Sequence, residues 1–140
     1  MTRIDFYILT DDTPQAAPLF ACRLSEKAWK QGHRIFLNAG SDAQLKQLDD
    51  MLWTFRAGSF LPHTVYREPG SSEPVLLGRD VDPTGEHDVL LNLSTVVPSF
   101  FSRFERVVEL VAGDESSRSA ARERYRFYQD RGYSLETHKL

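Results

Sequence analysis

Two apolar segments decide the fold of this chain: DVLLNL at residues 88–93 and RVVELV at residues 106–111. Each has the length of a β-strand, and a continuous apolar run is typical of a strand that is covered on both faces. IDFYIL at residues 4–9 and RIFLNA at residues 34–39 have the same character, and a shorter run lies at residues 75–77. We therefore expect a central sheet with helices on both of its sides.

Amphipathic segments alternate with these strands along the chain. Three of them have apolar residues at helical spacing: residues 14–31, a segment capped by Ser41 or Asp42, and residues 114–131, closed by Gly132. A short helix is expected over residues 98–104, and the tail from Tyr133 is expected to pair as an edge strand. Strands that alternate with helices form βαβ units, so the sequence predicts one three-layer α/β/α domain over residues 1–140 with a mainly parallel sheet.

The composition is that of an ordinary folded domain. Of the 140 residues, 41% are hydrophobic and 26% are charged. No apolar run approaches the ~20 residues that cross a bilayer, and the first residues lack the pattern of a signal peptide. Cys22 is the single cysteine, which excludes an internal disulfide and a cysteine-rich zinc site. We therefore expect a cytoplasmic protein.

The charge is distributed unevenly. The formal net charge is −3, yet residues 118–131 contain five arginines against two carboxylates and so carry +3, which leaves −6 for the rest of the chain. A globally acidic protein is poorly suited to coating nucleic acid, because phosphate binding requires clustered Lys and Arg. The C-terminal segment is a basic island on an acidic protein.

The outline is Rossmann-like, but the sequence has no nucleotide-binding loop. TDDTPQ at residues 10–15 follows the first predicted strand and contains no glycine. Neither G-x-G-x-x-G nor G-K-[ST] is therefore present where a phosphate would approach the backbone. Two carboxylates at this turn would also repel a phosphate, so nucleotide binding is not expected.

Asp11 and Asp12 leave one enzymatic alternative open, a small α/β phosphotransfer or nucleotide-binding enzyme that holds magnesium at the end of the first strand. That chemistry also needs an aspartate after a central strand and a lysine after a later one, and the expected positions carry neither. The favoured interpretation is that both carboxylates cap the following helix, where the helix dipole stabilises them.

No other catalytic constellation is visible in the sequence. The four histidines lack the close spacing of metal ligands, and no serine lies in a G-x-S-x-G turn. Cys22 lies in the middle of a predicted helix, where a packed, inert thiol is the ordinary interpretation. The sequence therefore predicts no catalytic residue, no metal site and no cofactor.

An aromatic segment remains unexplained by these patterns. Residues 53–63 have the composition of an irregular connection and contain Trp53, Phe55, Phe60 and Leu61. Large apolar residues in such a segment either fill the core or form an exposed patch that anchors a partner. Composition alone leaves these two alternatives even.

The C-terminal helix is the second unexplained feature. Arg118, Arg122 and Tyr125 stand at i, i+4 and i+7, so they share one face, and Val111 ends the strand before this helix. Arginine forks beside an apolar floor suit an acidic peptide that carries an aromatic side chain. The alternative is a solvated face with internal Glu–Arg pairs, and the residues by themselves favour it.

Several blocks of the chain together resemble one known family. They are FYIL (6–9), EKAWKQGHRIFL (26–37), LDDMLWTFRAGSFLPH (48–63), HDVLLNLS (87–94) and ARERYRFYQDRGY (121–133). The most specific patterns are L-D-x-x-L-W…S-F-x-P-H and A-R-E-R-Y-x-x-Y-x-x-x-G-[FY]. In the order and spacing of these blocks, nearly the whole chain resembles the chi subunit family of bacterial DNA polymerase III.

This resemblance implies a non-catalytic accessory subunit of the polymerase holoenzyme, cytoplasmic and located at the replisome, that works in DNA replication. Chi proteins pair with the psi subunit and join the clamp-loader complex through it. They also bind the acidic, phenylalanine-terminated C-terminal tail of the single-stranded DNA-binding protein. Position by position, the resemblance places the tail site on Arg118, Arg122, Tyr125 and Val111, and the psi site on Trp53 and Phe60.

The two binding sites that the resemblance implies are the aromatic segment and the C-terminal helix. For both features, the resemblance therefore favours partner binding over the alternatives of core filling and a solvated face. Position 118 is Arg where the family leads us to expect Lys, so the positive charge is retained. Nothing is carried over to residues 67–85, the least similar segment. Direct binding of single-stranded DNA by the C-terminal arginines is expected to be weak or absent, because one helix face offers few phosphate contacts.

Overall fold

The computed structural model describes residues 1–58 and 60–140. Its elements follow one another in the order β1 (Arg3–Ile8), α1 (Ala16–Lys30), β2 (Ile35–Asn38), α2 (Asp42–Thr54), β3 (His63–Val65), β4 (Val75–Gly78), β5 (Val89–Asn92), the 3-10 turn η1 (Phe101–Arg103), β6 (Arg106–Val111), α3 (Glu115–Asp130) and β7 (Ser134–Lys139). The five predicted strands and the three predicted long helices are all present. Within the described residues, no helix has both the length and the apolar character needed to span a bilayer.

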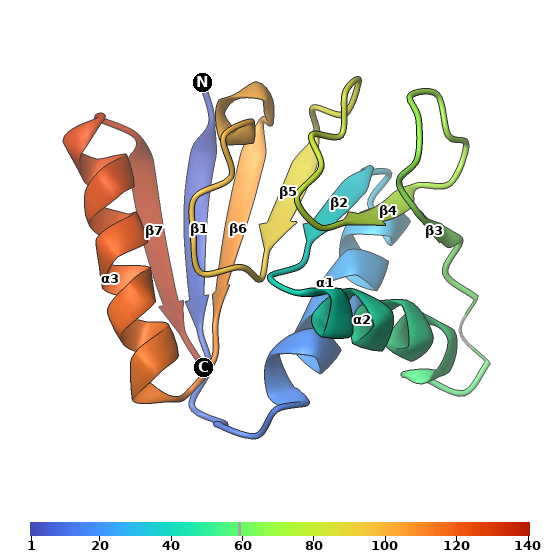
Figure 1. Cartoon of the computed structure of the whole chain (residues 1–140), viewed down its shortest axis with the longest axis horizontal. Helices are drawn as coiled ribbons and strands as arrows, with labels where there is room; N and C mark the ends of the chain where they lie inside the picture. Colours follow the sequence, from blue (N-terminus) through green and yellow to red (C-terminus); the bar gives the residue numbers. More distant parts are fainter. Residues whose placement is uncertain (59) are drawn as a thin grey trace.

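All described strands form one sheet in the order β3-β4-β2-β5-β6-β1-β7, and every neighbouring pair is parallel. The prediction of a mainly parallel sheet is confirmed, and the tail after Tyr133 forms the edge strand β7 as expected. Because every strand runs in the same direction, the carboxyl ends of all strands lie along one edge of the sheet (Figure 1). This edge is where parallel α/β proteins form their binding sites.

Helices cover both faces of the sheet (Figure 1), so the three-layer prediction is confirmed. Residues of α1 and α2 pack on one face over alternate strand residues, among them Ile35, Leu37, Val89, Leu91 and Val108. Residues of α3 pack on the other face, in a core that includes Ile4, Phe6, Leu90 and Val107. In the central strands, successive side chains enter opposite cores, which is why these strands read as continuous apolar runs.

Local signals in the sequence explain the helix ends. Of the two candidate caps for α2, Ser41 is the one used: its hydroxyl accepts the backbone N–H three residues later at 3.1 Å. Asp114 caps α3 in the same way at 3.0 Å. Gly132 follows α3 with φ +78°, a left-handed conformation that favours glycine.

Two local predictions are wrong. Residues 53–63 are not a connection throughout, because α2 continues through Thr54 and His63 begins β3. A strand of three residues is too short to show a periodic pattern, so the sequence did not reveal it. The helix expected over residues 98–104 is reduced to the single turn η1, since Phe104 is already extended (φ −85°, ψ 146°) where the chain enters the core.

Candidate functional site

A pocket with a volume of about 330 Å³ opens between α3 and the carboxyl ends of β1, β6 and β7. Buried apolar side chains form its floor: Phe6, Val111 and Ala121. The four residues that the resemblance assigns to the tail site, Arg118, Arg122, Tyr125 and Val111, all line this one pocket. The spacing on α3 therefore predicted a shared face correctly, and the sheet supplies the floor beneath it.

Arg118 reaches into the pocket wall with an incomplete set of hydrogen bonds. Its Nη2 donates to the Leu9 carbonyl at 3.4 Å, which is a long hydrogen bond. Its Nε is buried and has no hydrogen-bond partner among the described residues. A buried donor without an acceptor costs about 1–3 kcal/mol.

Arg122 lies at the solvent-exposed side of the pocket. Its Nη2 donates to Oε1 of Glu115 at 2.7 Å, and the two side chains are 59% and 76% exposed. An exposed ion pair of this kind contributes only about 0–1 kcal/mol. Arg122 can therefore exchange Glu115 for a carboxylate of another molecule at small cost.

Tyr125 contributes an aromatic wall that is held by the sheet. Its ring lies 5.4 Å from the ring of Phe6, at an angle of 57°. Phe6 is in turn almost completely buried. Tyr125 is half-buried and lines the pocket together with Phe6.

Among the pocket residues that the sequence analysis missed are Thr137 and Lys139 of β7. In the register of the parallel pair β1–β7, Thr137 lies beside Phe6 and Lys139 lies beside Ile8. Neighbours in register point to the same face of a sheet, so both side chains enter the pocket. The alternation of the tail suggests that they share a face, but only the pairing of β7 with β1 brings them to this site.

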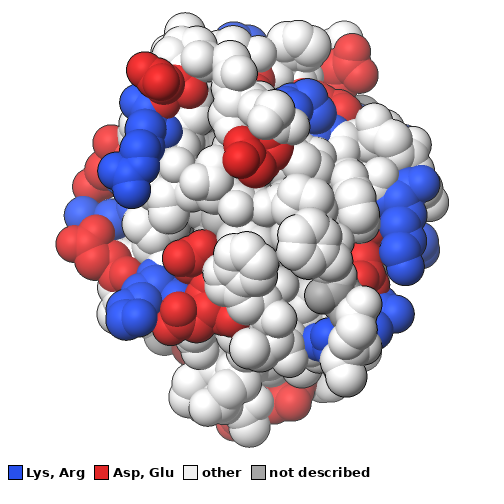
Figure 2. Space-filling view, turned by 90° about the vertical axis from the view of Figure 1, so that its right-hand side faces the viewer, with Lys and Arg blue, Asp and Glu red and all other residues white. Residues whose placement is uncertain are grey.

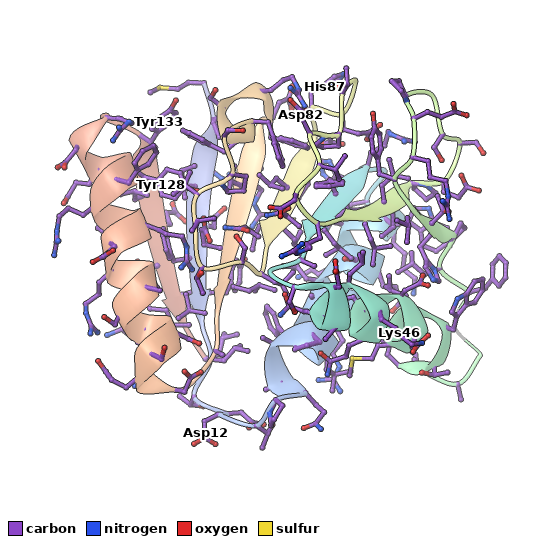
Figure 3. The ribbon with its side chains drawn as sticks, in the orientation of Figure 1. Asp12, Lys46, Asp82, His87, Tyr128 and Tyr133 are labelled. Atoms are coloured by element: carbon purple, nitrogen blue, oxygen red, sulfur yellow. The ribbon has the colours of Figure 1, made fainter. Side chains whose placement is uncertain are left out.

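A buried polar network lies under α3. The Glu109 carboxylate accepts from Arg124 Nε at 3.0 Å, from the Tyr128 hydroxyl at 2.7 Å and from Asn92 Nδ2 at 3.0 Å. Figure 3 shows Tyr128 pointing from α3 toward the sheet. Burial raises the pKa of Glu109, while the charge of Arg124 and the three donors oppose that rise.

Because of this network, fewer of the arginines in residues 118–131 carry a free charge at the surface than the sequence suggests. Arg124 is buried and neutralised by Glu109. The guanidinium of Arg131 lies 3.5 Å from the centre of the Phe127 ring, in a cation–π contact. Burial of Arg124 removes one of the five arginines of residues 118–131 from the surface, whereas the exposed pair of Arg122 with Glu115 remains exchangeable.

A second feature, which we call the aromatic patch, consists of Trp53 and Phe60. Their side chains are 57% and 71% exposed, and their ring centroids lie 6.5 Å apart. The sequence left open whether these residues fill the core or form an exposed patch, and the structure shows both. Leu61 is buried in the core, while Trp53 and Phe60 face solvent. Figure 2 views the molecule from the β3 side and shows a largely uncharged central band flanked by charged side chains.

Asp11 and Asp12 lie in the loop between β1 and α1. Oδ1 of Asp11 accepts the backbone N–H of Thr13 at 2.9 Å, and the hydrogen bonds from Thr13 lower the pKa of Asp11. Asp12 is exposed in the loop after β1 and points away from the domain (Figure 3). Asp11 thus closes a turn before α1, which begins only at Ala16. The prediction that both carboxylates cap this helix is wrong, because the N-cap position is Gln15 and the first turn contains no acidic residue.

One group of potential metal ligands occurs in the described part of the chain: Asp5, Glu136 and His138. Asp5 is already engaged, because its Oδ2 accepts from Arg106 Nε at 2.8 Å and lies 3.3 Å from Arg3 Nε. His138 Nε2 lies 3.3 Å from the other oxygen of Asp5. The group is part of a network of ion pairs and hydrogen bonds in which His138 links β7 to β1.

Comparison with known proteins agrees with the resemblance. The family model of the DNA polymerase III chi subunit, HolC, matches residues 1–136. DNA polymerase III subunit chi of Pseudomonas aeruginosa is 43% identical over 140 residues, which cover 100% of this chain and 98% of that protein. The same subunit of Escherichia coli is 31% identical over 143 residues, which cover 98% and 97% of the two chains. The chain therefore belongs to the DNA polymerase III chi subunit family, whose members are non-catalytic accessory subunits of the holoenzyme.

Proposed function

We propose that this chain connects the psi subunit of the clamp-loader complex to the acidic C-terminal tail of the single-stranded DNA-binding protein. The observation that carries this proposal is the pocket in which Arg118, Arg122 and Lys139 surround an apolar floor. An acidic peptide that ends in phenylalanine has the complementary chemistry, with an aromatic ring, a terminal carboxylate and several side-chain carboxylates.

Each part of the tail has a counterpart in the pocket. The terminal phenylalanine ring packs on Val111 and against Tyr125, and the terminal carboxylate accepts from the guanidinium of Arg118, which lines the pocket. The preceding carboxylates lie near Arg122 and Lys139. This division assigns the half-buried Arg118 to the chain end and the exposed cations to the acidic side chains.

The expected affinity is modest. A short peptide in a pocket of about 330 Å³ should bind at micromolar strength, about −8 kcal/mol. Binding should weaken with salt, because the exposed cations contribute through screened charge interactions. Several tails presented by one DNA-binding protein make weak individual contacts effective.

The aromatic patch is the proposed contact for psi. Trp53 and Phe60 are large exposed aromatic residues next to β3, at one edge of the sheet. The pocket adjoins β1 and β7, which lie at the opposite edge. The order of the strands therefore separates the two surfaces, and both partners can be bound at the same time.

Fluorescence polarisation with a labelled acidic peptide ending in phenylalanine tests the tail site. We expect Arg118→Ala and Arg122→Ala to abolish measurable binding, while Arg126→Ala, a neighbouring exposed cation of α3, changes it little. Circular dichroism checks that each variant is folded. Unchanged affinity in both Arg118→Ala and Arg122→Ala would remove the site assignment.

Two further titrations separate the partners. Trp53→Ala should weaken association with psi and leave tail binding unchanged, and a joint loss would indicate unfolding instead. A bare oligonucleotide, titrated in the absence of the single-stranded DNA-binding protein, should bind weakly or not at all. Tight binding of the oligonucleotide would assign the arginines of α3 to nucleic acid.

A further inference from the structure

The exposed indole of Trp53 rests on a buried histidine. The ring centroids of Trp53 and His63 lie 4.4 Å apart at an angle of 57°. The His63 side chain is 0% exposed, whereas Trp53 is 57% exposed. His63 therefore lies beneath the aromatic patch and cannot itself contact a docked protein.

The orientation of the His63 ring is set from two sides. Nδ1 lies 2.7 Å from the Leu61 carbonyl oxygen, in a buried hydrogen bond. A carbonyl only accepts, so Nδ1 carries a proton and donates. On the other side, Nε2 lies 3.4 Å from Oδ1 of Asp49 without the alignment of a hydrogen bond, and this contact is attractive when the ring carries both protons.

These contacts explain a sequence pattern that the proposed binding residues alone leave unexplained. Asp49 and Trp53 stand at i and i+4 on α2, so they share the side of the helix that faces β3. His63 is the first residue of β3, and Leu61 precedes it by two residues. The acid, the indole and the imidazole in L-D-x-x-L-W…S-F-x-P-H thus meet in one contact cluster.

We propose that His63 is a positioning residue that holds the Trp53 indole in its docking orientation before the partner arrives, with Asp49 as a secondary support. The proposal rests on the proposed function of the aromatic patch as the psi contact. An exposed side chain that is already ordered loses less conformational entropy when it is bound. On that ground, loss of the histidine should weaken association about 3- to 10-fold.

The test uses the full chain with Trp29→Phe as background, so that Trp53 is the one tryptophan that reports. His63→Asn retains a donor near the position of Nδ1 and removes the ring under the indole. His63→Phe retains a ring and removes the donor to Leu61. His87→Asn is the matched control, because His87 is exposed and distant from Trp53 along the chain (Figure 3).

We expect His63→Asn to lower the time-resolved fluorescence anisotropy of Trp53 and to weaken association with psi about 3- to 10-fold. The affinity for the tail peptide and the circular dichroism spectrum should stay unchanged, and His87→Asn should change nothing. His63→Phe should preserve more of the indole order than His63→Asn. Asp49→Asn should act in the same direction as His63→Asn with a smaller effect.

The outcomes distinguish this inference from the proposed function. If Trp53→Ala leaves psi association intact, the psi contact is misassigned. If Trp53→Ala weakens association but His63→Asn changes neither anisotropy nor affinity, the positioning role is overturned. Should His63→Asn not fold, ¹⁵N relaxation of the Trp53 indole N–H in the unmodified chain decides, since an order parameter below about 0.6 would contradict a prepositioned ring.

Discussion

Arg124 of α3 and Glu109 of β6 form a buried ion pair in which Arg124 Nε lies 3.0 Å from Oε1 of Glu109. The two side chains are 5% and 0% exposed. Tyr128, one turn further along α3, donates to the second oxygen of the same carboxylate. This network attaches α3 to the sheet. It therefore helps to set the position of Arg118 and Arg122 relative to the pocket floor.

Arg124→Ala should lower the free energy of unfolding by about 3–5 kcal/mol, because it leaves the Glu109 carboxylate buried without its charge partner. Urea denaturation followed by circular dichroism measures the change. Arg126→Ala, two residues along the same helix and exposed, should change the free energy of unfolding by less than about 0.5 kcal/mol. Replacing both partners, as Glu109→Met with Arg124→Leu, should be less destabilising than Arg124→Ala alone. Equal stability of Arg124→Ala and Arg126→Ala would contradict this account of the network.

Glu115→Gln should strengthen binding of the acidic tail peptide about 2- to 5-fold at low salt. The substitution removes the carboxylate that occupies Arg122 at 2.7 Å, and an exposed pair of this kind is worth about 0–1 kcal/mol. Glu123→Gln removes the same charge from another position on α3 and serves as the control in the same polarisation titration. A gain of equal size in both variants would point to net charge rather than to release of Arg122.

Lys139→Ala should weaken tail binding about 3-fold and reduce the dependence of affinity on salt. Its side chain lines the pocket from the strand opposite α3, where it adds a cation to the two arginines. Lys46→Ala, an exposed lysine of α2 that pairs with Asp50, loses the same charge far along the chain (Figure 3). An unchanged affinity and salt dependence in Lys139→Ala would exclude β7 from the tail site.

Asp5 should make the stability of the domain dependent on acid pH. Burial opposes its ionisation, but hydrogen bonds from Arg106 and His138 outweigh that effect and lower its pKa below the ordinary 3.8. The stabilisation is fully present above the ordinary pKa and is lost as the pH falls through the lowered value in the folded state. The difference in unfolding free energy between the unmodified chain and Asp5→Asn should therefore shrink from pH 7 to pH 3 in urea titrations. A difference that stays constant over this range would show that the charge of Asp5 does not contribute.

Cys22 should resist thiol reagents in the folded protein. Burial raises its pKa from the ordinary value to about 12, which lowers the thiolate fraction near pH 8 about a thousandfold. Titration with a chromogenic disulfide reagent should show slow modification under native conditions and rapid modification in urea. Rapid native reaction would show that α1 opens readily.

The local structure could be predicted from the sequence to a large extent, because it depends on residues that are close along the chain. Continuous apolar runs identified the strands covered on both faces, such as Val89–Asn92. Apolar spacing, the cap at Asp114 and the stop at Gly132 identified α3, and its i, i+4, i+7 spacing correctly placed Arg118, Arg122 and Tyr125 on one face. The resemblance carried by five sequence blocks identified the family, which the comparisons confirm.

Features that depend on distant parts of the chain were decided only by the tertiary structure. The order of the strands brings Lys139 beside Ile8 and so completes the pocket, whereas the sequence shows no trace of that pairing. From the sequence, Arg124 is expected to be one of the surface cations of the basic island. In the structure it is buried, and its charge is paired with Glu109, 15 residues away on β6. The exposure of Trp53 and the burial of Leu61 likewise depend on which surfaces α2 and β3 leave uncovered. Periodicity records which face of an element is apolar, while packing between elements decides which charges are neutralised and which side chains remain accessible.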